Sequence, residues 1–400
     1  MNPVTRLRLP IAGVAVAMVT ALSACSNGSS GEARNAGGEP PKPTPLIKIS
    51  PAKGTEVRPD RKVVVTAANG SLEQVTVQSG GKIVKGAFNR ARTTWVSKEP
   101  LKPGSTYTVS ATARGEGGPA TVTSQFNTLK PKYELYVADV TPNIKGEVVG
   151  VGMPIMVTFN RPVVDKAAVE RALKVTAEKP VRGAWRWIND RLVIYRPEKF
   201  WPAHQKVKFT ANLVGVRGGP GMYGVKNTTT TINIGAAWIS TVNVKTHTMV
   251  VKRDGKVMRV MKISAGKATT REYTTTSGIH LTMERGNPVT MISPNRKPGD
   301  PDYYKMEVNH AVRISNSGEY VHAAPWSVWA QGRANVSHGC INAHPDDAKW
   351  FYDNFHRGDV VKIVGTDRQL EWNNGWGFWQ LSFNEWRKGS ALYRAAASRA

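Results

Sequence analysis

The chain has 400 residues and a formal charge of +26, from 55 Lys and Arg against 29 Asp and Glu. This length is too great for one hydrophobic core and favours two to four domains. Basic residues are spread along the chain rather than concentrated on one helix, so no nucleic-acid partner is expected. The expected polyanion is an anionic membrane face or an acidic wall polymer, and a charge that only aids solubility is the alternative.

Residues 1–25 have the pattern of a lipoprotein signal peptide. A basic start precedes an apolar run over residues 11–22, which is shorter than the roughly 18 residues of a membrane-spanning helix. The following Leu-Ser-Ala-Cys matches the bacterial lipobox and predicts a diacylglyceryl group on Cys25. The exported protein would then sit on the outer face of the cytoplasmic membrane and reach the cell wall. Ordinary secretory cleavage near the same site is the alternative.

Three segments follow the signal peptide. Residues 26–45 are rich in Ser, Gly, Glu and Pro and predict a flexible linker. Residues 46–130 and 131–235 predict two related β-sandwich domains. In the first, apolar and polar residues alternate from Thr106 to Ala113, which is the period of a strand with one buried face.

Residues 236–365 predict a further, mainly β domain. Two β-like runs flank Asp254-Gly255, which is a strong hairpin signal. Residues 346–355 can form a helix.

The tail, residues 366–400, is unusually aromatic. Five of its aromatic residues fall at spacings of four and three: Trp372, Trp376, Trp379, Phe383 and Trp386. Ser382 and Glu385 form a capping box, which predicts a helix start there. A carbohydrate-stacking surface is one interpretation. Packing of the tail onto the preceding domains is favoured, because apolar stripes are usually core.

If lipid occupies Cys25, Cys340 is the one remaining thiol of an exported protein. An unpaired thiol in such a compartment suggests a nucleophile. A thiol reacts as the thiolate, which needs a base or a positive neighbour. The candidates are His322, His338 and His344, and the last is assigned no role.

The same residues also raise the possibility of zinc. The spacing of His338, Cys340 and His344 is not that of a standard zinc motif, and no second cysteine or nearby acidic ligand completes the set. We expect no metal and no cofactor. Gly339 would let the backbone turn tightly, so that neighbouring amides form an oxyanion hole.

Two stretches carry a close family resemblance: His-Ala-Ala-Pro-Trp-Ser-Val at 322–328 and Ser-His-Gly-Cys-Ile-Asn at 337–342. They resemble the active-site signature of the L,D-transpeptidases, whose catalytic domain is of the YkuD type. The layout resembles the actinobacterial lipoprotein branch of that family over nearly the whole chain, although only 322–342 is highly specific. Thr-Thr-Ser-Gly at 275–278 looks like a diverged Thr-Pro-x-Gly segment. The implied fold is mainly β, with two immunoglobulin-like sandwiches, a catalytic β-domain and a short helical C-terminal subdomain.

The resemblance implies roles for individual residues. Cys340 would be the nucleophile and His322 the general base. The amides of Gly339 and Cys340 would hold the oxyanion. His338, counted with the catalytic residues, and Asn342 would shape the loop. Family members of this branch usually have serine at 323; since that position orients the base through its backbone carbonyl, alanine should suffice.

A second group would bind substrate. Met291 and Tyr304 fall where the family has a flap over the donor site, and Trp326 and Ser337 belong to the same predicted binding surface.

The implied reaction is peptidoglycan cross-linking. The thiolate would attack the carbonyl that joins the third residue of a stem peptide to its terminal D-alanine, and a neighbouring stem's amine would complete a 3→3 cross-link. Donor and acceptor stems are then the partners, and carbapenem β-lactams the expected inhibitors. Resolution by water (an L,D-carboxypeptidase), attachment of a protein amine, and a non-catalytic wall-binding lipoprotein are the alternatives.

Overall fold

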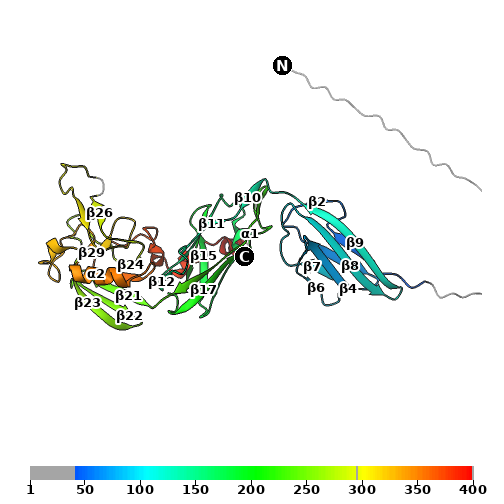
Figure 1. Cartoon of the computed structure of the whole chain (residues 1–400), viewed down its shortest axis with the longest axis horizontal. Coiled ribbons are helices and arrows are strands. Elements are labelled where there is room, and N and C mark those ends of the chain that lie inside the picture. The colour runs from blue at the N-terminus through cyan, green and yellow to red at the C-terminus, as the bar shows by residue number, and fades with distance from the viewer. Residues whose placement is uncertain (1–40, 294–295, 399–400) are drawn as a thin grey trace, which may run out of the picture. The chain divides into compact units, whose positions relative to one another are not determined.

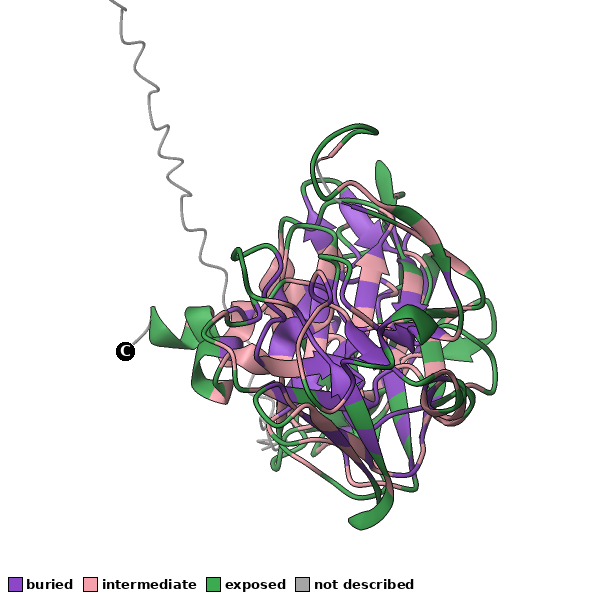
Figure 2. Cartoon of the chain, turned by 90° about the vertical axis from the view of Figure 1, so that its left-hand side faces the viewer, coloured by how far each residue is buried: buried purple, intermediate pink, exposed green. Residues whose placement is uncertain are grey.

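The computed structural model describes residues 41–293 and 296–398 (Figure 1). The predicted signal peptide, its Cys25 and the linker up to residue 40 lie outside the described residues. Within those two ranges, no helix is long and apolar enough to cross a membrane. Strands account for 44% and helices for 10%, which confirms a mainly β protein. Figure 2 shows that the buried residues follow the interior strands, whereas outer loops and strand ends are exposed.

The first sandwich is made of two sheets around one core. Its strands are β1 (Leu46–Ser50), β2 (Glu56–Val57), β3 (Val64–Ala68), β4 (Ser71–Ser79), β5 (Lys82–Ile83), β6 (Gly86–Phe88), β7 (Thr94–Ser97), β8 (Thr106–Gly115) and β9 (Gly118–Thr128). The sheet orders are β1-β3-β7-β6 and β2-β9-β8-β4-β5. The alternation predicted from Thr106 is confirmed, because Tyr107, Val109 and Ala111 of β8 are buried in the core.

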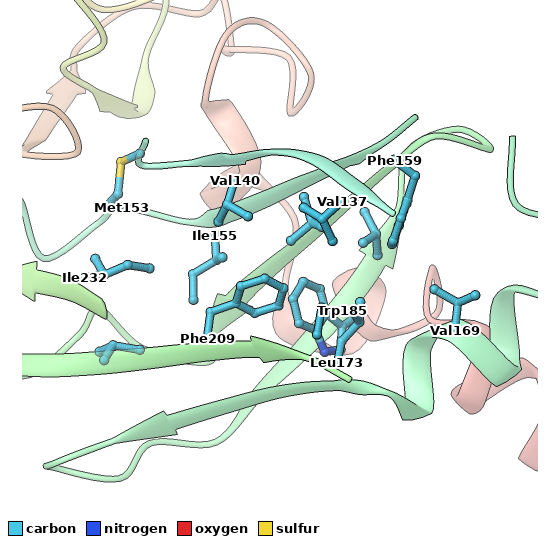
Figure 3. Close-up of a cluster of buried hydrophobic side chains, with 14 of the residues drawn as sticks. Val137, Val140, Met153, Ile155, Phe159, Val169, Leu173, Trp185, Phe209 and Ile232 are labelled. Carbon is cyan, nitrogen blue, oxygen red and sulfur yellow. The ribbon is translucent and has the colours of Figure 1, made fainter. Parts of the chain in front are cut away.

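The second sandwich has the same style with more elements. They are β10 (Tyr133–Leu135), β11 (Val137–Thr141), β12 (Val148–Val149), β13 (Ile155–Phe159), α1 (Lys166–Arg171), β14 (Leu173–Ala177), β15 (Gly183–Trp187), β16 (Leu192–Pro197), β17 (Gln205–Ala211), β18 (Arg217–Gly219), β19 (Met222–Gly224) and β20 (Thr228–Ile234). Sheets β11-β13-β16-β15 and β12-β20-β17-β14 enclose the core, and β10-β19-β18 form a small third sheet. In that core, the Trp185 ring meets Phe209 edge-on at 5.8 Å (Figure 3).

The third region is built on one nine-stranded sheet. Its elements are β21 (Trp238–Asn243), β22 (Thr248–Arg253), β23 (Lys256–Ser264), β24 (Gly278–Leu281), β25 (Arg285–Gly286), β26 (Val289–Ile292), β27 (Lys305–Val308), β28 (Ala311–Arg313), β29 (Tyr320–Ala323), η1 (Pro325–Ser327), β30 (Ile341–Ala343), α2 (Pro345–Asn354) and β31 (Val360–Val364). The order is β24-β31-β21-β22-β23-β30-β29-β28-β25, and β26 with β27 form a separate hairpin.

Two sequence predictions in this region are confirmed. Asp254 and Gly255 form the two-residue turn between β22 and β23, both with positive φ (49° and 84°), as a type I′ hairpin requires. The predicted helix forms as α2, one residue earlier than expected, because His344 caps it and Pro345 occupies its first turn.

The aromatic tail packs on the second sandwich, which confirms the packing interpretation. It contains η2 (Gly377–Gln380), α3 (Phe383–Arg387) and α4 (Ala391–Ala397). As predicted, α3 starts at Ser382, whose Oγ accepts from the Glu385 N–H at 3.2 Å. The Trp386 side chain is fully buried and donates from Nε1 to the carbonyl oxygen of Ala184, while Trp379 donates to that of Gly152, each at 2.9 Å.

Candidate active site

The pairing of two parallel strands brings the predicted base close to the start of the strand that follows the nucleophile. β29 pairs with β30 so that His322 lies opposite Asn342. Cys340 comes directly before β30, two residues from Asn342. His322, Cys340 and Asn342 all line one cavity, so the base and the nucleophile face the same space.

The imidazole of His322 is buried and fixed in one orientation. Its Nδ1 donates to the carbonyl oxygen of Ala323 at 2.9 Å, so Nε2 carries the free lone pair. Because the acceptor is the backbone carbonyl of residue 323, alanine can orient the base there as well as the serine that is usual in the family. Burial lowers the pKa of His322 to about 4, against the opposite effect of the Ala323 carbonyl, so the ring is neutral at pH 7.

Cys340 is a free, partly exposed cysteine. Its Sγ donates to the carbonyl oxygen of Gly318 at 3.5 Å. Burial of the sulfur raises the pKa of the Cys340 thiol to about 12. A hydrogen bond from the backbone N–H of Tyr320 lowers this pKa, and the negative charge of Glu319 raises it further. The resting centre is therefore a thiol beside a neutral imidazole, and the thiolate forms only when the base takes its proton.

The loop that carries the sulfur is held by its own hydrogen bonds. Ser337 Oγ donates to the carbonyl oxygen of Cys340 at 2.6 Å and accepts from the Gly339 N–H at 3.0 Å. The hydroxyl of Ser337, predicted to bind substrate, is thus committed to the loop. Gly339 has a φ of 130°, which favours glycine.

The predicted oxyanion donors differ in their present partners. The Gly339 N–H would first have to release Ser337 Oγ before it could hold an oxyanion. The N–H of Cys340 has no protein acceptor among the described residues. Cys340 is therefore the donor that is ready in this conformation.

Thr275 supports the nucleophile loop from behind, a contact that the sequence did not predict. It is fully buried, donates from Oγ1 to the carbonyl oxygen of Gly339 at 2.7 Å, and accepts from the Gly266 N–H at 2.9 Å. The sequence did mark this segment, because residues 275–278 resemble the Thr-Pro-x-Gly segment of the family. The segment lacks the proline of that motif, but the hydrogen bond from Thr275 to Gly339 is present without it.

His338 is an aromatic wall of the site rather than a partner of the sulfur. Its ring stacks on Tyr304 at 5.0 Å and meets Tyr273 edge-on at 4.6 Å. Burial and the Lys267 cation lower the pKa of His338. Asn342 is buried and donates from Nδ2 to Ser327 Oγ at 3.0 Å, so it ties the strand to the turn after His322.

Met291 and Tyr304 come from the β26–β27 hairpin, as a flap over the site would require. Met291 pairs with Met306 across the hairpin. Tyr304 binds back to Ser293, with its N–H on Ser293 Oγ and its carbonyl oxygen on the Ser293 N–H, both at 3.0 Å. Of the two predicted flap residues, Tyr304 stacks on His338, and Met291 lines the cavity beside it.

Two pockets meet at Cys340. The first, of about 430 Å³, is lined by both Glu272 and Glu319 and is here called the glutamate pocket. The second, of about 270 Å³, is lined by both Trp326 and Trp329 and is called the tryptophan pocket. Four residues line both pockets: Met291, Tyr304, His338 and Cys340. His322 lines the tryptophan pocket alone.

A buried carboxylate forms part of the glutamate pocket, and no sequence motif indicated it. Glu319 accepts from the backbone N–H of Thr276 at 2.7 Å and lies 3.6 Å from Nε2 of His280. Burial alone would raise the pKa of Glu319, but the hydrogen bonds from His280 and Thr276 hold it below its usual value. The carboxylate is therefore ionised close to the sulfur.

In the part of the chain that the structure describes, no group of three or more His, Cys, Asp and Glu side chains could hold a metal ion.

The chain is similar to known proteins over most of its length. A family model described as an L,D-transpeptidase catalytic domain matches residues 237–363, and one described as a bacterial Ig domain matches 54–217. The chain is 40% identical over 336 residues to L,D-transpeptidase 2 of Mycobacterium tuberculosis, covering 83% of this chain and 81% of the relative. It is 34% identical over 401 residues to L,D-transpeptidase 5 of that species, covering 98% and 86%. A solved structure of an LD transpeptidase in complex with imipenem is 37% identical, covers 57% of this chain and 98% of its own, and has a TM-score of 0.49.

Proposed function

The chain belongs to the L,D-transpeptidase family, and on that premise we propose that it joins two peptidoglycan stem peptides through an acyl group carried on Cys340. The observation that carries the proposal is the meeting of two pockets at the sulfur of Cys340, one of which also contains His322. A transferase of this kind needs one side of the nucleophile for the donor, and another for the leaving group and then the acceptor, and the two pockets supply both.

The first half-reaction is acylation. Nε2 of His322 takes the thiol proton, and Sγ of Cys340 bonds to the carbonyl carbon between the third and fourth residues of a tetrapeptide stem. The oxygen of the tetrahedral intermediate accepts from the N–H of Cys340. The carbon–nitrogen bond then breaks, D-alanine leaves with the proton from His322, and a thioester remains.

The second half-reaction reverses these events with a new amine. A side-chain amine of the acceptor stem loses a proton to His322 and attacks the thioester carbon. The carbon–sulfur bond breaks, and Cys340 regains its proton. Because the attacking amine retraces the path of the departing one, both must approach His322, which lines the tryptophan pocket alone. We therefore assign the donor stem to the glutamate pocket, and D-alanine and then the acceptor to the tryptophan pocket.

Product analysis tests the proposal. The full chain in detergent is incubated with a disaccharide-tetrapeptide, and the products are weighed by mass spectrometry. A cross-linked dimer that has lost one D-alanine is expected. A disaccharide-tripeptide as the main product would instead establish an L,D-carboxypeptidase, and transfer to a protein amine an attachment enzyme.

A carbapenem gives an independent test of the nucleophile, because its strained lactam carbonyl acylates a thiolate without any acceptor. One adduct per chain is expected with the native chain and none with Cys340→Ala, which should also abolish both half-reactions. Absence of an adduct on the native chain would favour a non-catalytic wall-binding protein.

The proposed location follows from the lipobox. We propose that Cys25 carries the lipid that keeps the enzyme on the outer face of the cytoplasmic membrane. Labelled palmitate should enter the native chain and not Cys25→Ala, which should appear in the soluble fraction. Equal labelling of the two chains would contradict the proposal.

A further inference from the structure

Trp329 is a large apolar side chain that the fold leaves in solvent. It lies just beyond η1 and is 68% exposed, and the neighbouring Trp326 is 46% exposed. Tryptophan is mostly buried in folded proteins, and exposed apolar clusters on them usually mark binding sites. The two indoles form the open end of the tryptophan pocket.

A second hollow, of about 500 Å³, is also lined by Trp329. The remaining lining residues are Val260, Lys262, Val328, Gln331, Arg333, His344 and Asp347. It is here called the basic groove, because the Asp347 carboxylate is already paired with Arg259. Trp329 lines both this groove and the tryptophan pocket, so the surface is continuous from the groove to Cys340.

The groove mixes apolar groups with free cations. At the end of β23 that lines the groove, Val260 and Lys262 are exposed, whereas Met261 between them is buried. Neither Lys262 nor Arg333 forms an ion pair within residues 41–293 and 296–398. A membrane or a large protein partner would favour a broad apolar patch. Small apolar faces interleaved with hydrogen-bond donors instead suit a sugar polymer, whose rings have C–H faces and whose edges have hydroxyl and amide oxygens.

The length of a stem peptide connects the groove to the chemistry. Three extended residues span at most about 10 Å, so an acceptor whose amine reaches His322 brings its glycan strand to within roughly that distance of the pocket. The basic groove adjoins that pocket at Trp329, which lines both.

We infer that the basic groove and Trp329 bind the glycan strand of the acceptor, and this inference rests on the proposed function. A sugar ring stacks on the Trp329 indole, and Lys262 and Arg333 donate hydrogen bonds to hydroxyl or N-acetyl oxygens. The enzyme thereby selects an acceptor stem that is still attached to sugar. The donor stem, in the glutamate pocket, is not selected by this groove.

The test compares two acceptors on the full chain in detergent. One is a tetrapeptide stem without sugar, and the other is the same stem carrying its disaccharide. The native chain should have the lower KM for the acceptor with sugar. Lys262→Gln/Arg333→Gln should reduce this preference by roughly three- to tenfold while the KM of the sugar-free acceptor stays unchanged, because two hydrogen bonds to the sugar are removed.

Trp329→Ala is the second variant. It should raise the KM of the disaccharide-bearing acceptor by roughly tenfold, and that of the sugar-free acceptor by less, because Trp329 also lines the tryptophan pocket. Ile83→Ala, an equally exposed apolar position in the first sandwich, is the matched control and should change neither.

Three outcomes decide the matter. An unchanged preference in the double variant, or an equal rise in both KM values in Trp329→Ala, overturns the glycan groove. Carbapenem acylation is measured in every variant, because it depends on Cys340 and not on the acceptor. Loss of acylation in the native chain would overturn the proposed function instead, so the two failures are distinguishable.

Discussion

The two pockets at Cys340 share one sulfur and differ in chemistry. The glutamate pocket is lined by two carboxylates, three tyrosines and the Gly318–Tyr320 segment, whereas the tryptophan pocket has methionine, valine and indole around His322. In the proposed reaction, the more polar pocket would orient the amides and carboxylates of a donor stem. The more apolar pocket, which contains the base, would disfavour water and a charged amine. The proposal therefore assigns any preference for transfer over hydrolysis to the tryptophan side of the sulfur.

His322→Gln should have the largest effect after removal of the nucleophile itself, because both half-reactions use this base. Loss of the general base is expected to lower carbapenem acylation and transfer by about 10² to 10⁴. In the native chain, kcat/KM should fall as pH drops through about 4, where burial has set the pKa of His322 and where Nε2 becomes protonated. A limb near pH 6.5 would contradict this assignment.

Thr275→Val tests the support that both pockets share. It leaves the Gly339 carbonyl and the Gly266 N–H without their buried partner, at a cost of roughly 1–3 kcal/mol each in unfolding free energy. Acylation and transfer should fall together by roughly tenfold, measured alongside the thermal midpoint. Thr275→Ser, which keeps the hydroxyl, should recover most of the activity. If Thr275→Val were as active as the native chain, the hydrogen bond from Thr275 to Gly339 would not be needed for catalysis.

Arg368→Met should act on the glutamate pocket alone. Its Nη1 donates to the carbonyl oxygens of Arg271, Glu272 and Thr274. Glu272 and Arg368 themselves line that pocket. Loosening this segment is expected to lower kcat/KM for acylation by roughly tenfold and to leave the KM of the acceptor unchanged. Arg114→Met, at an exposed ion pair of the first sandwich, is the control.

Met306→Ala should give the smallest effect and act on the tryptophan pocket alone. Truncation of this half-buried side chain is expected to raise the KM of the acceptor by roughly fivefold without slowing carbapenem acylation. Ile292→Ala, one residue beyond its partner on the same hairpin, lines only the glutamate pocket and should show the opposite pattern. The same pattern in both variants would contradict the division between the pockets.

Local patterns predicted those elements whose causes are local. The alternation at Thr106–Ala113, the Asp254-Gly255 turn and the cap at Ser382 each require only a few neighbouring residues. His322 and Cys340 were singled out because both lie within one specific motif. The cavity that they both line depends on the register of β29 and β30, which no single segment encodes.

What the sequence missed lies in contacts between distant segments. Thr275 reaches Gly339, and Thr276 reaches Glu319, across more than forty positions of chain. A single buried glutamate such as Glu319 produces no repeating pattern in the sequence that could reveal it. The sequence around Trp329 also does not distinguish an exposed tryptophan from a buried one. The commitment of the Gly339 N–H to Ser337 likewise depends on a turn geometry that the residue types permit but do not specify.

The aromatic tail gives the third region a second attachment to the sandwich before it. The chain enters that region near Trp238 and returns from it to bury Trp386 against Ile194. The two regions also contact each other directly, since the N–H groups of Gly150 and Gly152 donate to the carbonyl oxygens of Arg357 and Gly358. Rotation of the third region about the connecting strand would therefore break the tail packing and these hydrogen bonds together.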